Sequence, residues 1–113
     1  MSDEVLAKPG GETTAGGLAA LDRLLEHRSR LGACVILSNA DRLSFTRLKE
    51  LLQETDGNLG AHLRKLENAG YVAVDKQFEN RRPVSWYSLT VQGKGALKTH
   101  LDAMQALIQN SSI

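Results

Sequence analysis

The apolar positions follow a helical period over most of the chain and change to a period of two only once. Leucines at 18, 21 and 25, with charged residues between them, predict an amphipathic helix over 18–27. The following segment LGACVIL, at 31–37, is apolar on nearly every side. Its alanine, leucine and cysteine content favours a buried helix over a buried strand. The sequence therefore predicts two helices at the start of the folded region.

A second pair of helices follows, with a polar break at 54–56 between its members. Leucines at 48, 51 and 52 share one face of the first helix, and leucines at 59, 63 and 66 share one face of the second. Thr55 is a good N-cap for the second helix, and Gly70 is its expected C-terminal stop. Two short helices joined by about three residues match the helix-turn-helix pattern.

The period then changes to two. YVAVDKQF at 71–78 and VSWYSL at 84–89 alternate in polarity or are rich in strand formers, and they predict the two strands of a β-hairpin. The basic residues Arg81 and Arg82 lie between them. Pro83 has no N–H to donate to a neighbouring strand, so it is expected to mark the end of a strand or the loop.

The last predicted element is a helix over 91–109, for which Thr90 is the expected N-cap. Leu97, Leu101, Met104 and Ile108 form an apolar stripe at helical spacing, and Leu107 widens it. This stripe is wider than one small domain can easily cover. The excess apolar surface predicts contact with a second chain.

The net charge of +1 conceals an uneven distribution. Residues 1–27 hold two basic and five acidic residues, whereas the rest of the chain holds twelve basic and eight acidic ones. The folded region is therefore moderately basic. Four glycines and Pro9 among the first seventeen residues predict a flexible arm at 1–17, which leaves one domain at 18–113.

Composition argues against several classes of protein. No apolar run approaches the length of a membrane span, and the N-terminus lacks the features of a signal peptide, so we expect a cytoplasmic protein without membrane contact. One cysteine and three separated histidines predict no disulfide, no metal site and no cofactor. Cys34 lies in the apolar run at 31–37 and is expected to be a buried, inert thiol. No arrangement of residues points to an enzyme.

Taken in order, these elements resemble the winged-helix transcription regulators, in particular MarR-like and ArsR-like repressors and their short single-domain subfamily. The stretch LSFTRLKELLQETDGNLGAHLRKLENAGYV resembles their helix-turn-helix and following strand, NRRPVSWYSLT resembles the wing, and LTVQGKGAL resembles the start of the closing helix. The resemblance spans roughly residues 18–105. It implies a mostly helical α+β fold, a winged helix-turn-helix with a two-stranded β-wing and terminal dimerisation helices at 18–27 and 91–109.

The resemblance also implies that the helix beginning near Asp56 lies in the major groove of double-stranded DNA, with the wing on the minor groove or the backbone. The residues expected to contact DNA are Asn58, Ala61, His62, Arg64, Lys65, Arg81, Arg82 and Arg47. Gly60 and Ala61 depart from the family pattern, which usually has serine or a longer polar residue at one or both positions. This departure weakens the case for base readout by hydrogen bonds, although an alanine can contact a thymine methyl.

A dimer is expected because one chain offers few cations and would bind DNA weakly at physiological salt. The resemblance places the interface on the terminal helices, through Leu18, Leu21, Leu25, Leu97, Leu101, Met104, Leu107 and Ile108. A two-fold dimer would set two recognition helices about 34 Å apart on a pseudo-palindromic operator. The resemblance favours a repressor over an activator. A small-molecule effector, if one exists, would have to bind at the dimer junction.

A second interpretation stays open at this point. The chain could be a winged helix that contacts another protein and binds no specific DNA. The modest charge and the small residues at 60 and 61 favour this alternative slightly. Salt-dependent DNA binding that disappears when Arg81 and Arg82 are replaced would distinguish the two.

Overall fold

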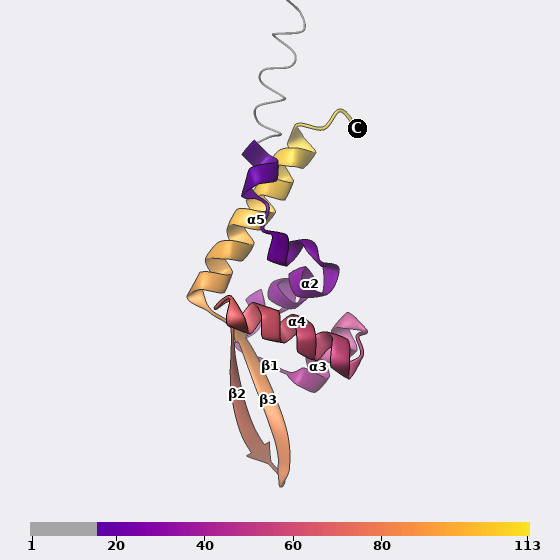
Figure 1. Cartoon of the computed structure of the whole chain (residues 1–113), viewed down its shortest axis with the longest axis vertical. Helices are drawn as coiled ribbons and strands as arrows, with labels where there is room; N and C mark the ends of the chain where they lie inside the picture. Colours follow the sequence, from indigo (N-terminus) through magenta and orange to yellow (C-terminus); the bar gives the residue numbers. More distant parts are fainter. Residues whose placement is uncertain (1–15) are drawn as a thin grey trace, which may run out of the picture.

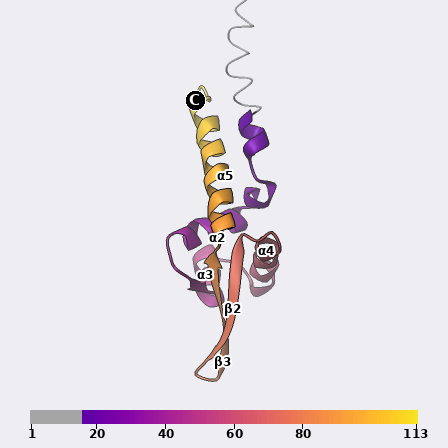
Figure 2. The same cartoon turned by 90° about the vertical axis from the view of Figure 1, so that its left-hand side faces the viewer.

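The computed structural model describes residues 16–113, which form a body of short helices with a β-hairpin at one end and a long helix at the other (Figures 1 and 2). In chain order the elements are the 3-10 helix η1 at Arg23–Glu26, α2 at Arg28–Ser38, β1 at Leu43–Ser44, α3 at Phe45–Leu52, α4 at Asp56–Asn68, β2 at Val72–Glu79, β3 at Arg82–Leu89 and α5 at Val91–Gln109. Residues 16–20 are also helical. The predicted arm at 1–17 falls outside the described residues except for its last two glycines, which are helical.

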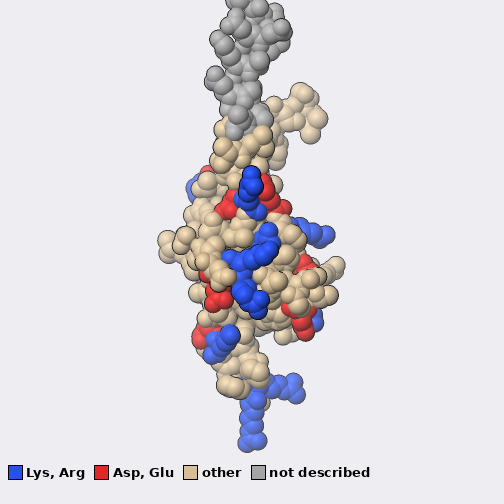
Figure 3. All heavy atoms as spheres, in the orientation of Figure 1, with Lys and Arg blue, Asp and Glu red and all other residues tan. Residues whose placement is uncertain are grey.

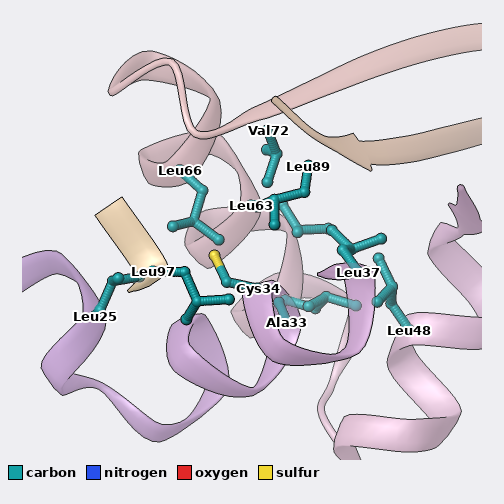
Figure 4. Packing of buried hydrophobic residues seen from close by; sticks show 11 residues of the cluster. Leu25, Ala33, Cys34, Leu37, Leu48, Leu63, Leu66, Val72, Leu89 and Leu97 are labelled. Atoms are coloured by element: carbon teal, nitrogen blue, oxygen red, sulfur yellow. The ribbon is translucent and has the colours of Figure 1, made fainter. Parts of the chain in front are cut away.

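Helix α2 lies at the centre of the core, as its apolar sequence predicts. The buried cluster around it consists of Leu25, Ala33, Cys34, Leu37, Leu48, Leu59, Leu63, Leu66, Val72, Leu89 and Leu97 (Figure 4). Burial, together with the nearby charge of Asp22, raises the pKa of the Cys34 thiol to about 11. Cys34 is therefore a protonated core thiol of low reactivity, which confirms the prediction.

Helices α3 and α4 form the predicted helix-turn-helix. The Thr55 hydroxyl caps α4 by accepting a hydrogen bond from the backbone N–H of Asn58 at 3.2 Å. Gln53 ends α3 in the left-handed conformation, with φ 53°. Gly70 follows α4 with φ +81°, a conformation that glycine adopts without strain, so the predicted stop is confirmed.

The hairpin of β2 and β3, the wing, joins β1 in an antiparallel sheet with the order β1–β3–β2. The sequence predicted both wing strands but not β1, which is only two residues long. Asn80 and Arg81 form a two-residue turn with φ 52° and 66°, which suits the right-handed twist of a hairpin. The predicted winged helix, mostly helical and with a two-stranded wing, is confirmed.

Strand β3 begins earlier than predicted, because Pro83 does not end it. Pro83 pairs with Phe78, one position further from the turn than the pair of Glu79 and Arg82. In an antiparallel ladder the hydrogen-bonded and non-hydrogen-bonded pairs alternate, and the pair next to a two-residue turn is hydrogen-bonded. Pro83 therefore lies at a non-hydrogen-bonded pair, where its missing N–H removes no bond to β2.

The segment 18–27 is not the single helix that the sequence predicts. The first helical segment stops at residue 20, and η1 follows after a two-residue break. The Asp22 side chain caps η1 by accepting a hydrogen bond from the Leu24 N–H at 2.9 Å, and it also accepts one from the Tyr71 hydroxyl. The Asp22 N–H donates to His100 Nδ1 at 2.9 Å. These distant partners fix a corner that the local leucine spacing could not reveal.

Helix α5 begins where predicted and packs closely on the body. Thr90 caps it by accepting a hydrogen bond from the Gly93 N–H at 2.9 Å. A Cβ at Gly93 would lie 2.1 Å from the Tyr71 carbonyl oxygen, so glycine is needed for this close approach. The helix turns Leu97 and His100 toward the core.

Candidate nucleic-acid interface

Helix α4 turns its leucines inward and a largely polar face outward, as predicted. Leu59, Leu63 and Leu66 are buried. The exposed positions are Gly57, Asn58, Ala61, Arg64, Lys65 and Asn68, with Asp56 and Glu67 beside them. Asp56, in the first turn, pairs with Lys49 Nζ at 2.9 Å, and it suits the positive end of the helix dipole. Of the residues predicted to contact DNA from this helix, His62 alone does not lie on the exposed face.

The N-terminal half of this exposed face carries few side-chain atoms. A Cβ added at Gly57 or Gly60 would meet no atom within 4 Å. Glycine in a helix interior costs roughly 1 kcal/mol relative to alanine. The packing at Gly93 requires glycine, whereas the packing at these two positions does not. The surface over Gly57, Gly60 and Ala61 is therefore open to close approach by another molecule.

His62 lies on the inner flank of α4, and only 15% of its side chain is exposed. Its Nδ1 lies 3.0 Å from Nη1 of Arg30, and its ring centroid lies 4.1 Å from that of His27. Its Nε2 lies 3.9 Å from a carboxylate oxygen of Glu54. Because a guanidinium can only donate, Nδ1 accepts and the ring N–H is on Nε2. Both ring nitrogens face protein groups, so this position does not support the predicted contact between His62 and a phosphate.

Arg30, in α2, connects its own helix to η1 and to the inner side of α4. Its Nε donates to the Leu24 carbonyl at 2.6 Å, and its Nη1 donates to His62. Glu54, which lies between α3 and α4, accepts a hydrogen bond from the hydroxyl of Ser29 in α2. This polar network fixes the helix-turn-helix against η1 and α2. Sequence reasoning missed it because no local spacing relates its members.

The polar network favours a neutral His62 and a charged Glu54. Burial lowers the pKa of His62 below its usual 6.5, and the charges of His27 and Arg30 lower it further. The hydrogen bond from Ser29 lowers the pKa of Glu54 below its usual 4.5. A proton on His62 Nδ1 would remove the acceptor that Arg30 uses and would place two cations in contact.

The wing carries its basic residues at the tip. Arg81 lies in the turn and Arg82 begins β3, and both are exposed. Figure 3 shows basic side chains at the far end of the hairpin, separated from those on the body. Behind the tip, the Trp86 indole donates to Glu79 at 2.8 Å, and the Arg42 guanidinium lies 4.2 Å from the centroid of the Trp86 ring. These contacts support one face of the hairpin.

Four of the cations predicted to contact DNA keep an uncompensated charge. Within 16–113, the ion pairs involve Arg47, Lys49, Lys98 and His62. Arg47, at the start of α3, lies 3.3 Å from Glu50, so its charge is partly balanced. Among the cations predicted to contact DNA, those that are exposed and form no ion pair with another described residue are Arg64, Lys65, Arg81 and Arg82.

The apolar residues predicted for a dimer interface are only partly available. Leu25 and Leu97 are 0% and 5% exposed, because both belong to the core of a single chain. Their assignment to the interface is therefore wrong. Leu18, Leu101 and Ile108 remain 56%, 40% and 65% exposed.

A hollow of about 290 Å³ lies between α5 and the segment that precedes α2. The half-buried interface candidates Leu21, Met104 and Leu107 line it, together with His100. Figure 2 shows the last turns of α5 extending past the body beside the helical segment 16–20. This end of the molecule therefore keeps apolar surface that the described chain does not cover.

Residues 16–113 contain no group of three or more His, Cys, Asp or Glu side chains placed to hold a metal ion. No helix within that range combines the length and the apolar character needed to cross a bilayer. The surface formed by the exposed face of α4 and the basic wing tip is the candidate site.

Two comparisons of sequence relate the chain to known proteins. Residues 29–108 match the winged helix DNA-binding domain family. A protein of Methanocaldococcus jannaschii, itself uncharacterized, is 33% identical over 81 residues, which cover 72% of this chain and 88% of that protein.

Solved structures share the fold. A transcriptional regulator homologue from Pyrococcus horikoshii superposes with a TM-score of 0.79 at 26% identity, over 90% of this chain and 99% of that one. A MarR-family regulator from Streptomyces coelicolor, solved in complex with DNA, superposes with a TM-score of 0.61 at 22% identity, over 99% of this chain and 77% of that one. The chain therefore belongs to the winged helix DNA-binding domain family and is a DNA-binding transcription regulator of the winged-helix type.

Proposed function

We propose that the protein is a homodimeric repressor that binds a specific double-stranded operator, with α4 in the major groove and the wing on the minor groove or the adjacent backbone. The observation that supports this most is the combination of an open helix face on α4 with an exposed basic wing tip. Both lie away from the free end of α5 (Figure 1). An α-helix fits the major groove, where each base pair presents a distinct set of groups.

The proposed contacts differ along the surface. Asn58, near the N-terminus of α4, faces a base or a phosphate, and Ala61 faces a thymine methyl. Arg64 and Lys65 lie further along the helix and contact phosphates, while Arg47 reaches the flanking backbone. The guanidinium groups of the wing tip suit both phosphates and the electronegative minor groove.

A dimer is part of the proposal because the charge of one chain is small. Each neutralised phosphate contributes about −0.9 to the slope of log affinity against log salt, so four exposed cations give weak binding at physiological salt. Leu18, Leu101 and Ile108 offer the surface for a second copy. A two-fold axis there would place the two α4 helices in successive major grooves about 34 Å apart.

Repression follows from occupancy, since a dimer bound over a promoter excludes polymerase without a further domain. The Streptomyces coelicolor regulator was solved in complex with DNA, which supports a duplex as the ligand. Regulators of this type are typically not enzymes. The hollow beside α5, at the proposed dimer junction, is where an effector would bind if the protein has one.

Selection from a random pool of duplexes tests the proposal. We expect an enriched inverted repeat with half-sites about one helical turn apart and binding that weakens steeply with salt. Enrichment of a single half-site would contradict the dimer. Weak binding at low salt without enrichment would contradict sequence-specific recognition. Lys98→Ala removes an exposed cation that is paired with Asp102 on α5, away from the proposed surface. It is the control for the loss of a positive charge outside that surface, and it should bind the selected duplex as the wild type does.

The second candidate function is a contact with another protein. The small-residue surface over Gly57, Gly60 and Ala61 favours it, because these side chains donate no hydrogen bonds to bases. If this alternative holds, replacing Arg81 and Arg82 with alanine should leave the weak DNA binding unchanged.

A further inference from the structure

The face of the wing that packs on the body continues past the point where the body covers it, and it carries an exposed apolar residue near the tip. Side chains alternate along a strand, so Val72, Val74, Lys76 and Phe78 of β2 share one face. Val72, at the base, is buried in the core, whereas Phe78, near the tip, is 79% exposed. Phe78 lies opposite Pro83, which is also exposed. Cβ atoms of such pairs are about 4.5–5.5 Å apart, so the two side chains form one apolar patch.

Two basic residues lie beside this wing patch, which consists of Phe78 and Pro83. Arg81 lies beyond it in the turn, and Lys76 is the preceding residue on the same face of β2. Arg82 and its cross-strand partner Glu79 lie on the opposite face of the hairpin. Pro83 also lines a shallow hollow of about 270 Å³ that leads to the start of α3. The wing patch therefore adjoins the surface already proposed for DNA, and its charge is complementary to a polyanion.

We propose that the wing patch packs against deoxyribose rings at the rim of the minor groove while the tip arginines enter the groove. This inference rests on the proposed function, because it needs the wing to contact a duplex. Duplex DNA presents charged phosphates beside apolar sugar C–H groups. A patch that combines an exposed aromatic ring with arginines matches both.

The dimensions of the hairpin are consistent with this placement. The minor groove is about 6 Å wide, which admits an extended arginine but not two strands that are about 4.8 Å apart with their side chains. The hairpin therefore stays at the rim while its tip arginines reach inward. Phe78 is two residues before the turn, roughly 7 Å along the strand, which places its ring at the level of the sugars that border the groove.

Apolar contacts and phosphate contacts respond differently to salt. Neutralising a phosphate releases counterions, so its contribution to affinity falls as salt rises. Packing a phenyl ring against a sugar releases no counterion. The contribution of Phe78 should therefore be nearly the same at every salt concentration, and this separates it from that of Arg81.

Binding to a mixed-sequence duplex over a salt series tests the inference, because deoxyribose is the same in every sequence. We expect Phe78→Ser to weaken binding about tenfold at every salt concentration, with the slope unchanged. Arg81→Ala should lower the slope by about one unit. Val91→Ser is the matched control, since Val91 is an apolar residue that is 86% exposed at the opposite end of the wing. It should bind as the wild type does, and all three variants should unfold at the wild-type temperature.

Hydroxyl-radical footprinting gives a second readout, because the radicals attack sugar C–H groups at the minor groove. At saturating protein the wild type should protect sugars under the wing, and Phe78→Ser should lose protection at the sugars that border the groove while it keeps the protection given by the tip arginines. If Phe78→Ser binds and protects as the wild type does, the inference is wrong and the patch faces a protein or a lipid instead. A changed slope for Phe78→Ser would also overturn it, since it would show that the substitution alters the number of neutralised phosphates. If the wild type binds no duplex even at low salt, the proposed function itself fails.

Discussion

Helix α4 and the wing contribute to one candidate surface, but they are constructed in opposite ways. Buried leucines and the contact of Arg30 with His62 hold α4 from behind. Its outward face is nearly bare at Gly57 and Gly60. The wing extends beyond the elements that cover its base, and it carries its two arginines and Phe78 at the exposed tip.

The two regions therefore differ in how they would meet DNA. The braced helix can approach DNA closely in a fixed orientation at its bare N-terminal half, and it carries Arg64 and Lys65 further along. The extended wing tip attracts DNA through Arg81 and Arg82 and needs less exact placement. A change at Gly60 should therefore alter close approach, and changes to the wing arginines should alter the dependence on salt.

The largest effect is expected from Ile108→Glu, which places a charge in the proposed dimer surface. Without the dimer, the second copy of α4 and of the wing no longer binds the same duplex. The variant should sediment as a monomer, and its affinity for the selected duplex should fall by about a hundredfold, because linked binding events gain that much from effective concentration. Gln109→Glu, which adds the same charge at the neighbouring exposed position, is the control and should stay dimeric. An Ile108→Glu protein that keeps the mass and affinity of the wild type would refute this dimer surface.

The next effect concerns the wing alone. Replacing Arg81 and Arg82 with alanine should reduce the salt slope by about 0.9 for each phosphate that the wing no longer neutralises. Affinity should converge with that of the wild type at high salt, where counterion release contributes less. The measurement is a titration of the selected duplex at several salt concentrations. An unchanged slope would show that the wing does not contact phosphates.

A smaller effect is expected on α4. Gly60→Ala should stabilise the protein by roughly 1 kcal/mol, because alanine is the better helix former and the new Cβ meets no neighbour. Its affinity for the selected duplex should nevertheless fall several-fold if the backbone there approaches DNA closely. Gly95→Ala, on α5, also has open space around the new Cβ and is the control for stability without an effect on DNA binding. Unchanged DNA binding by Gly60→Ala would remove the case for close approach.

The smallest effect is a dependence on pH through the polar network behind α4. Because the folded protein lowers the pKa of His62 below 6.5, it resists protonation of this residue more than the unfolded chain does. Stability should be full above pH 6.5 and fall as the pH drops below that value. Chemical denaturation in this range should show the decrease in the wild type and a weaker dependence in His62→Gln. The contribution of Glu54 disappears only below its usual pKa of 4.5, so the two effects are separable.

Local chemistry explains which parts of the fold the sequence predicts well. Thr55 and Gly70 mark the two ends of α4 because a cap and a left-handed residue act on adjacent backbone groups. The corner at Asp22 could not be predicted, since it depends on Tyr71 and His100 far along the chain. The leucine spacing across it continues as if a helix were present.

The candidate site was predictable to a similar degree. Leucine spacing indicated the exposed face of α4, including Arg64 and Lys65. It could not place His62, whose partners Arg30 and His27 come from another part of the fold. Phe78 shares its face with the buried Val72 and the half-buried Val74, and it is exposed because the hairpin extends beyond the helices. How far the hairpin extends beyond the helices depends on the tertiary structure, so the local sequence pattern does not reveal it.

Methylation interference on the selected duplex examines both grooves in one measurement. Dimethyl sulfate modifies guanine N7 in the major groove and adenine N3 in the minor groove. A dimer with α4 in the major groove and the wing on the minor groove predicts interference from N7 methylation in two half-sites about one turn apart, and from N3 methylation in the flanks. Interference in one groove only, or at a single half-site, would contradict this arrangement.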